Sequence, residues 1–300
     1  MKVLFLCQRD WANHSFIMTQ CLNEVGINSQ AVTTHPNKIK FPEHALLCKS
    51  SSKLNSIIAK SNIIIFMHSQ FVGTDVNLKK KKILVFHTGS KYRQHSGKMN
   101  SIFNPIVSAT LTAADTFNLG GINEKYVVVP VDTKKLLPDY TTSDKLVIAH
   151  YPSGSKGKET IKEVIATLGN NFVFKYDNTR IDWISNIKRI SECDIYIEDL
   201  REHQKGKVTS GFGLTALEAA SLGKIVVTRL TYLEKYEKEL GKCAIQVANN
   251  KEELKTVLTK LLNINKSEII KLKQESRNWV ERLHSYKSVG NMFKRIFEEL

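Results

Sequence analysis

The chain has 300 residues, and 42% of them are hydrophobic, which is enough for two domains with sizeable cores and excludes a disordered chain. No apolar run approaches the roughly 18 to 20 residues of a membrane-spanning helix, and MKVLFLCQRDW at the N-terminus predicts a buried strand rather than a secretory signal. The 44 Lys and Arg against 29 Asp and Glu give a net charge of +15, which favours an anionic partner such as a nucleotide, an anionic lipid surface or a nucleic acid. The five cysteines are scattered, without a CxxC or Cys/His cluster, so we expect buried free thiols and no metal site.

The first half alternates short apolar runs with helical stretches, the pattern of a parallel α/β layer. Its first run, KVLFLC, lacks alternation, as expected for a parallel strand covered on both faces. We predict strands at 2–7, 28–33, 62–68, 82–87, 105–110 and 125–130, and helices at 15–25 and 112–118. Two of these strands end in a histidine, His68 and His87.

A polar segment with two of the six prolines follows, and we predict an interdomain linker at 133–144. In the second half we predict strands at 145–150, 172–176, 194–197, 224–228 and 243–247, and helices at 158–168, 183–190, 214–222, 233–240 and 251–262, followed by a helical tail at 267–300. The fold class is therefore α/β, with two Rossmann-like, doubly wound domains at 1–132 and 145–282. Because open α/β sheets bind ligands at the carboxyl ends of their strands, we expect the two domains to face a central cleft.

A glycine-containing turn stands before one of these helices, in SGFGLTALEAASLGKIVVT at 210–228. Gly211 and Gly213 permit a tight turn close to a ligand, and a helix from Leu214 would direct free N–H groups and a positive dipole end toward an anion. A plain loop-to-helix turn, with Ser210 as N-cap and Glu218 as a surface charge, fits the same residues. The turn alone leaves both interpretations open.

The same stretch resembles the donor-site signature E-G-F-G-L-x-x-L-E-A-x-A-x-G-x-P-V-V of the retaining GT-B glycosyltransferases of family 4, group 1 type. Other stretches agree in the family's order: HTGSKYR at 87–93, VPVDTKKLLP at 129–138, IAHYPSGSKGKETIKEVI at 148–165 and the closing WVERLHSYKSVGNMFKRIFEEL. The resemblance spans nearly the whole chain. It implies a GT-B architecture in which the last helix, 283–300, packs back on the first domain.

The resemblance also implies roles for particular residues. Glu218 would bind the ribose hydroxyls of a nucleotide sugar, since a carboxylate accepts two hydrogen bonds. Lys156 would stabilise the departing diphosphate, and His87 would lie near the transferred sugar, with His68 as its competitor. Ser210 takes the catalytic position of the family's first glutamate. The residues implied for binding the donor are Ser153, Gly154, Gly211, Phe212, Gly213, Leu214 and Glu218.

The chain departs from the family pattern in three places. Ser210 keeps a hydrogen-bonding oxygen but lacks the glutamate's charge, and the sequence leaves open whether activity is reduced or lost. The arginine that usually precedes the lysine is absent from PSGSKGK, and Lys158 and Arg201 are candidates to replace it. The first loop, CQRDWANHS, lacks the family's glycines. Arg9, Asp10 and Trp11 there are candidates for acceptor contacts, or else for a packed tryptophan beside a surface ion pair.

We therefore expect a hexosyl-type glycosyltransferase that transfers a sugar with retention from a UDP or GDP sugar, without a metal or another cofactor. We expect it in the cytoplasm or at the inner face of the membrane. A saccharide or lipid-linked acceptor in envelope polysaccharide or glycolipid assembly is favoured, because no basic-aromatic nucleic-acid module is visible. The alternatives are a phage-type DNA glucosyltransferase, a non-catalytic sugar-nucleotide-binding relative and a sugar-nucleotide epimerase. The sequence leaves open the donor sugar, the acceptor and the oligomeric state.

Overall fold

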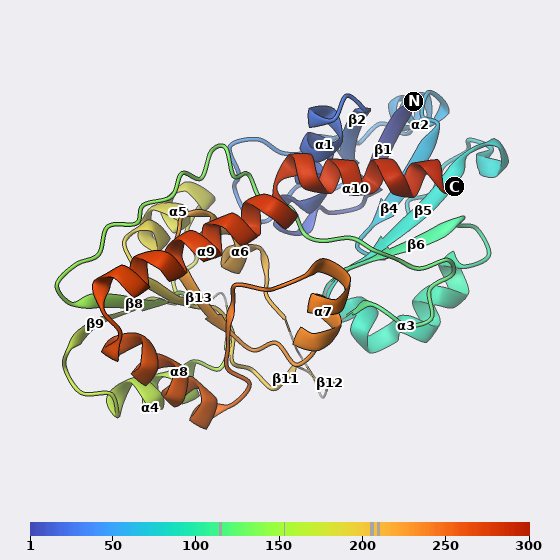
Figure 1. The fold of residues 1–300 in the computed structure, drawn as a ribbon. Helices are drawn as coiled ribbons and strands as arrows, with labels where there is room; N and C mark the ends of the chain where they lie inside the picture. The colour runs from blue at the N-terminus through green and yellow to red at the C-terminus, as the bar shows by residue number, and fades with distance from the viewer. Residues whose placement is uncertain (114–115, 153, 205–206, 209–210) are drawn as a thin grey trace. The chain divides into compact units, whose positions relative to one another are not determined.

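The computed structural model describes residues 1–113, 116–152, 154–204, 207–208 and 211–300. The chain divides into two compact units, which are described separately (Figure 1). Unit 1 comprises Met1–Pro130 and Ser285–Leu300, and unit 2 comprises Val131–His284. Within the described residues, no helix is both long enough and apolar enough to cross a membrane.

Unit 1 is built on a parallel sheet with the strand order β3-β2-β1-β4-β5-β6-β7. The strands are β1 (Lys2–Cys7), β2 (Asn28–Thr33), β3 (Leu46–Leu47), β4 (Ile63–Met67), β5 (Lys82–His87), β6 (Ala109–Thr112) and β7 (Lys125–Tyr126). β1 is buried from Val3 to Cys7, which confirms the prediction from its unbroken apolar run. The strand order reverses between β1 and β4, and sheets of this kind bind ligands beyond the carboxyl ends of the strands at such a switch point.

The helices of unit 1 are α1 (His14–Glu24), α2 (Ser51–Ala59), α3 (Gly89–Phe103) and α10 (Tyr286–Glu298). Figure 1 shows α10, in red near the C-terminus, lying beside α1. Its buried residues Val289, Phe293 and Phe297 recur with helical spacing and form the stripe that packs inward. Gly290 lies so close to the carbonyl oxygen of Cys21 that a Cβ at this position would overlap it. Close helix packing thus attaches the end of the chain to its beginning.

The structure differs from the predicted elements of unit 1 in three ways. The helix predicted at 112–118 lies partly outside the described residues, at 114 and 115; in its described part Thr112 ends β6, Thr116 has 3-10 geometry and 117–118 form a turn. The strand predicted at 125–130 is reduced to β7, and the one predicted at 105–110 begins four residues later and ends two residues later. Helices α2 and α3 were not predicted, because α3 has glycines and charged residues within it and is kinked at His95.

Unit 2 contains a second parallel sheet, in the order β14-β13-β10-β8-β9, which confirms the second doubly wound sheet. Its strands are β8 (Leu146–His150), β9 (Phe172–Tyr176), β10 (Ile195–Ile197), β13 (Ile225–Thr228) and β14 (Gln246–Val247). Its helices are α4 (Lys158–Ala166), α5 (Trp183–Ser191), α6 (Leu214–Ser221), α7 (Leu233–Leu240), α8 (Lys251–Asn263) and α9 (Lys266–His284). A short hairpin of β11 (His203–Gln204) and β12 (Lys207–Val208) was not predicted. The strand order reverses between β8 and β10, which defines a second switch point.

The polar segment predicted as a linker has no regular structure and is tied to unit 2 by α9. Arg277 donates hydrogen bonds to the carbonyl oxygens of Thr133 and Leu136, each at 2.6 Å. Lys273, whose side chain is fully buried, donates to the carbonyl oxygen of Thr141 at 2.6 Å. Two buried cations therefore donate to backbone oxygens of this segment.

Candidate active site

Two charged side chains meet at the switch point of unit 2. Lys156 lies in the loop after β8, and Glu198 follows β10 directly. Their Nζ and Oε1 atoms are 2.5 Å apart, and both side chains are largely buried. Lys156 has a φ of +39°, and at the next position, Gly157, a Cβ would lie 3.0 Å from the backbone of Leu200. The KG dipeptide is therefore what lets this loop pass close to the end of β10.

Glu198 also faces the glycine-containing turn before α6. It is 3% exposed, and its Oε2 atom has no hydrogen-bond partner within the part of the chain that the structure describes. A Cβ at Gly213, the N-cap of α6, would lie 3.1 Å from its Oε1 atom. A buried carboxylate oxygen without a donor is costly unless a ligand supplies one. Glu198 therefore offers an acceptor to a polar ligand at this turn.

Glu218 lies one turn into α6 and is 4% exposed. The indole Nε1–H of Trp183, at the start of α5, donates to its Oε1 atom at 2.6 Å. Burial raises the pKa of Glu218 to about 7; the Trp183 hydrogen bond opposes this shift, the charge of Glu198 adds to it, and that of Lys156 opposes it. The charges of Glu198 and Lys156 thus act on Glu218, the second buried carboxylate near this turn.

The other residues that the resemblance implies for the donor site lie in or near the glycine turn and in the loop after β8. Gly211 has a φ of +119°, and a Cβ there would overlap the hydroxyl of Tyr232. The ring of Phe212 packs against Trp279, with the ring centroids 5.4 Å apart. Gly154 is exposed and Leu214 half-buried. Ser153 and Ser210 lie outside the described residues.

The two cations considered as replacements for the missing arginine are held by neighbouring acids. Lys158 Nζ lies 3.5 Å from Glu159 Oε1 on the surface, and Arg201 Nη2 lies 2.5 Å from Asp199 Oδ2. Lys156 is therefore the cation that the structure brings to Glu198.

At the switch point of unit 1 there is a pocket of about 600 Å³. It is lined by Gln8, Arg9, Trp11, His35, His68, Gln70, Thr88, Gly89 and Lys91. These residues lie in the segments that directly follow β1, β2, β4 and β5, including the start of α3, and so at the carboxyl ends of four neighbouring strands. Arg9 and Trp11, which the sequence offered as acceptor contacts, both lie here, and Trp11 is 47% exposed rather than packed.

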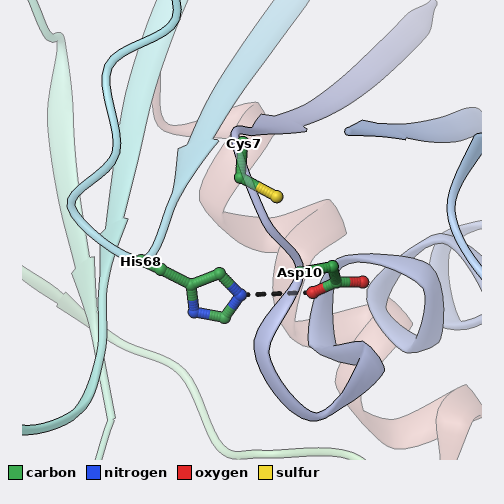
Figure 2. A group of neighbouring side chains, drawn as sticks. All are labelled: Cys7, Asp10 and His68. Atoms are coloured by element: carbon green, nitrogen blue, oxygen red, sulfur yellow. Dashed lines mark hydrogen bonds and ion pairs between the residues drawn. The ribbon is translucent and has the colours of Figure 1, made fainter. Parts of the chain in front are cut away.

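His68 is held in this pocket from two sides. Its Nε2 atom lies 3.2 Å from Asp10 Oδ1, and its Nδ1 atom lies 2.7 Å from Thr88 Oγ1 (Figure 2). Asp10 also accepts hydrogen bonds from the backbone N–H groups of Ser15 and Phe16 at the start of α1, at 2.8 and 3.2 Å. Burial alone would raise the pKa of Asp10, but the hydrogen bonds from His68 and Ser15 and the charge of His68 hold it below its ordinary value. An ionised Asp10 thus orients the His68 ring.

Cys7, Asp10 and His68 bring three ligand-type atoms within 4.8 Å of one another, as Figure 2 shows. Burial raises the pKa of Cys7 to about 12, with the charge of Asp10 adding to the shift, so the thiol stays protonated, whereas metals bind the thiolate. Its Sγ atom already lies 3.4 Å from the hydroxyl of Ser15. We therefore interpret the group as a hydrogen-bonded support for His68.

His87, the residue that the resemblance implies near the sugar, is fully buried. Its ring stacks on Tyr92 with centroids 3.9 Å apart, and its Nδ1 atom lies 2.8 Å from Ser69 Oγ. Burial lowers its pKa to about 3, so the ring is neutral. His87 is not among the residues that line the pocket, whereas His68 is. His150, at the end of β8, is likewise buried and bonded to the Ile197 carbonyl oxygen at 2.8 Å.

Glu198 and Trp183 are site residues that sequence reasoning missed. The available signal for Glu198 was its place directly after the short apolar strand DIYI, where α/β sheets present polar groups to ligands. Trp183 had no comparable signal. It is the first residue of a predicted helix, and the sequence does not show which residues this helix packs against.

Comparison with solved structures shows the fold. Anabaena HepE in complex with UDP-glucose is 11% identical, with a TM-score of 0.66 and 100% of both chains covered. An alpha-glucosyltransferase (AGT) in complex with UDP and a 13-mer DNA containing a HMU base is 12% identical, with a TM-score of 0.67 and 99% and 98% covered. AviGT4, a glycosyltransferase involved in avilamycin A biosynthesis, is 10% identical, with a TM-score of 0.59 and 99% and 97% covered. No family model and no curated protein matches the chain. These likenesses confirm the predicted fold class, that of the GT-B glycosyltransferases.

Proposed function

We propose that the chain is a glycosyltransferase that binds a UDP sugar at the switch point of unit 2. The observation that carries the proposal is the buried Lys156–Glu198 pair against the glycine turn at Gly213, with the buried Glu218 one turn into the helix that follows. A nucleotide sugar offers a diphosphate and several hydroxyls. The cation and the N–H groups at the start of the helix suit the diphosphate, and the two buried carboxylates suit the hydroxyls. The solved structures of the same fold, with UDP or UDP-glucose bound, support UDP among the nucleotides.

Each of the three side chains has a task in this proposal. Lys156 stabilises the charge that develops on the departing diphosphate, a role that many enzymes give to a metal ion, so we propose metal-independent transfer. Glu218 accepts hydrogen bonds from the ribose hydroxyls. Glu198 holds Lys156 through Oε1 and offers Oε2 to a hydroxyl of the donor sugar. In this way Glu198 supplies the carboxylate that is missing at Ser210.

For the transfer we propose that His68, rather than His87, is the unit 1 histidine beside the reacting groups. It lines the pocket and is oriented by Asp10 and Thr88. When the anomeric configuration is retained, the acceptor attacks the sugar from the same face that the diphosphate leaves. The leaving diphosphate can therefore take the acceptor's proton itself. His68 would then position the acceptor.

A thermal-shift panel of UDP, GDP, ADP, CDP and dTDP, each with its glucose conjugate, tests the proposal. A ligand at 100 times its Kd stabilises the folded state by about 2.7 kcal/mol, a readily measured shift. We expect UDP and UDP-glucose to give the largest shifts, unchanged by a chelator. A flat panel would refute the donor site. Binding without any release of UDP from UDP-glucose would instead indicate a non-catalytic sugar-nucleotide-binding protein.

A further inference from the structure

We propose that the unit 1 pocket binds a single nucleotide of a nucleic-acid strand, and that this nucleotide is the acceptor of the sugar. The inference rests on the proposed function for the transfer itself, but the binding of the strand stands on the pocket alone. The acceptor must offer a hydroxyl. Its oxygen bonds to the anomeric carbon, the bond from that carbon to the diphosphate oxygen breaks, and UDP leaves with the electron pair and takes up the proton.

The first observation is an exposed aromatic ring with two cations near it. Trp11 lines the pocket and is 47% exposed. The guanidinium carbon of Arg9 lies 5.6 Å from the centroid of its ring, and Lys38 Nζ lies 5.8 Å from it. Proteins that hold single strands combine such stacking platforms for the bases with cations for the phosphates.

The second observation is the charge of the pocket. Arg9 and Lys91 line it together with His35, and its described lining residues include no carboxylate. Asp10, the acid beside His68, is 2% exposed and already accepts hydrogen bonds from His68 and Ser15. An anionic ligand would therefore meet two cations without a competing acid. A neutral saccharide would leave both charges unused.

The third observation is the distribution of charge along the chain. Unit 1 holds 18 Lys and Arg against 8 Asp and Glu, whereas unit 2 holds 26 against 21. The excess of positive charge thus lies mainly in the unit that carries this pocket rather than in the proposed nucleotide-sugar site. A field of this sign attracts a polyanion and makes its binding dependent on salt.

The fourth observation is strained backbone on both sides of the pocket. Ala12 and Asn13 have φ values of +55° and +58° directly after Trp11, and His68 and Ser69 have values of +61° and +55°. Residues other than glycine rarely adopt this left-handed backbone conformation, and backbone strain of this kind is enriched at functional sites. One pair directly follows Trp11 and the other includes His68, and both Trp11 and His68 line the pocket.

The volume of the pocket determines whether single-stranded or duplex nucleic acid can enter it. About 600 Å³ lies within the range of small-molecule sites, so it admits one nucleotide but not a stacked duplex. The acceptor nucleotide must come from a single strand or be turned out of a duplex. A membrane surface could touch the rim of such a pocket but could not enter it, so we favour a nucleic acid over an anionic bilayer.

Fluorescence anisotropy of the full chain with a labelled 12-residue single-stranded DNA tests the proposal. We expect W11A to weaken binding about 5- to 150-fold, the range for one stacked base, and W11F to retain most of the affinity. K91A should weaken binding and reduce its salt dependence. The double variant K79A/K80A removes two exposed lysines that do not line the pocket, and its loss should be smaller than that of K91A. A duplex of the same sequence should bind more weakly.

The proposal is overturned if W11A and K91A bind the strand as the wild-type chain does, or if the duplex binds equally well. It is also overturned if phosphatidylglycerol vesicles bind in a Trp11-dependent manner and the strand does not. Titration of each variant with UDP separates this inference from the proposed function. A variant that loses strand binding but binds UDP normally has an altered unit 1 pocket and an intact donor site. If the wild-type chain binds the strand but not UDP, only the donor site is refuted.

Discussion

Lys156 Nζ lies 2.5 Å from Glu198 Oε1, although the two residues are 42 positions apart in the chain. The contact joins the loops after β8 and β10, the two strands between which the order of the unit 2 sheet reverses. In the proposed function, Glu198 holds the lysine in place before the donor binds, and the diphosphate then shares that charge. The other oxygen of Glu198 is buried and without a partner in the described chain, and it is the acceptor that we propose for the sugar.

We predict that E198A lowers the free energy of unfolding by about 1–3 kcal/mol, less than the about 3–5 kcal/mol of a fully buried pair because Lys156 is partly exposed. We also expect UDP to bind E198A at least as well as the wild-type chain, since Lys156 loses a competing anion, while UDP-glucose loses its advantage over UDP. Urea unfolding and titration calorimetry measure the two effects. E159A, which removes the exposed partner of Lys158, is the matched control and should change stability by under about 0.5 kcal/mol. An unchanged preference for UDP-glucose in E198A would contradict this role of Glu198.

We predict that stability declines with rising pH because of Glu218. Its pKa is raised from 4.5 to about 7, chiefly by burial, so between these values the folded state holds a proton that the unfolded state has released. The folded state then binds more protons, and the free energy of unfolding falls as the pH rises through that interval. Urea unfolding at pH 5 and pH 8 should show this decline in the wild-type chain and a smaller one in E218Q.

The same carboxylate should couple UDP binding to proton release. Ribose hydroxyls favour its ionised form, so calorimetric binding enthalpies at pH 6.5 should depend on the ionisation enthalpy of the buffer in the wild-type chain and not in E218Q. Equal buffer dependence in both chains would place the ribose elsewhere.

We predict that W183F destabilises the chain by about 1–3 kcal/mol, because it leaves the buried Oε1 atom of Glu218 without the indole donor. Since that hydrogen bond opposes the rise in the pKa of Glu218, the decline of stability with pH should also move to higher pH. W11F, at an exposed tryptophan, should change stability by under about 0.5 kcal/mol and serves as the control. Identical urea curves for W183F and W11F would show that the indole hydrogen bond contributes nothing.

We predict that G290A destabilises unit 1 although it adds only a methyl group. The new Cβ would overlap the Cys21 carbonyl oxygen and lie 2.9 Å from Val25 Cγ1, so α1 and α10 must separate. Overpacking of this kind costs typically about 1–3 kcal/mol. G97A is also within a helix and its Cβ meets nothing within 4 Å, so it should be neutral or stabilising by up to about 1 kcal/mol. Thermal unfolding of both variants measures the difference, and a G290A chain as stable as G97A would argue against the close packing of the two helices.

The two parallel sheets could be predicted from the sequence because buried parallel strands leave unbroken apolar runs. The turn at Gly213 and the helix that carries Glu218 could be predicted because both lie within one short stretch. Glu198 could not, since it reaches Lys156 only through the pairing of β8 with β10. His68 and His87 differ in their place relative to the end of a strand. β4 ends at Met67, so His68 follows the strand and lines the pocket, whereas His87 is the last residue of β5 and lies in the core.

Isothermal titration of UDP into the wild-type chain, K156A, E218A, S210A and the control K158A tests the central claim most directly. We predict that K156A and E218A weaken binding at least about tenfold, or about 1.4 kcal/mol, while K158A, at an exposed surface pair, and S210A bind nearly as the wild-type chain does. Equal affinities in all five chains, or no binding of UDP to the wild-type chain, would contradict a donor site at the switch point of unit 2.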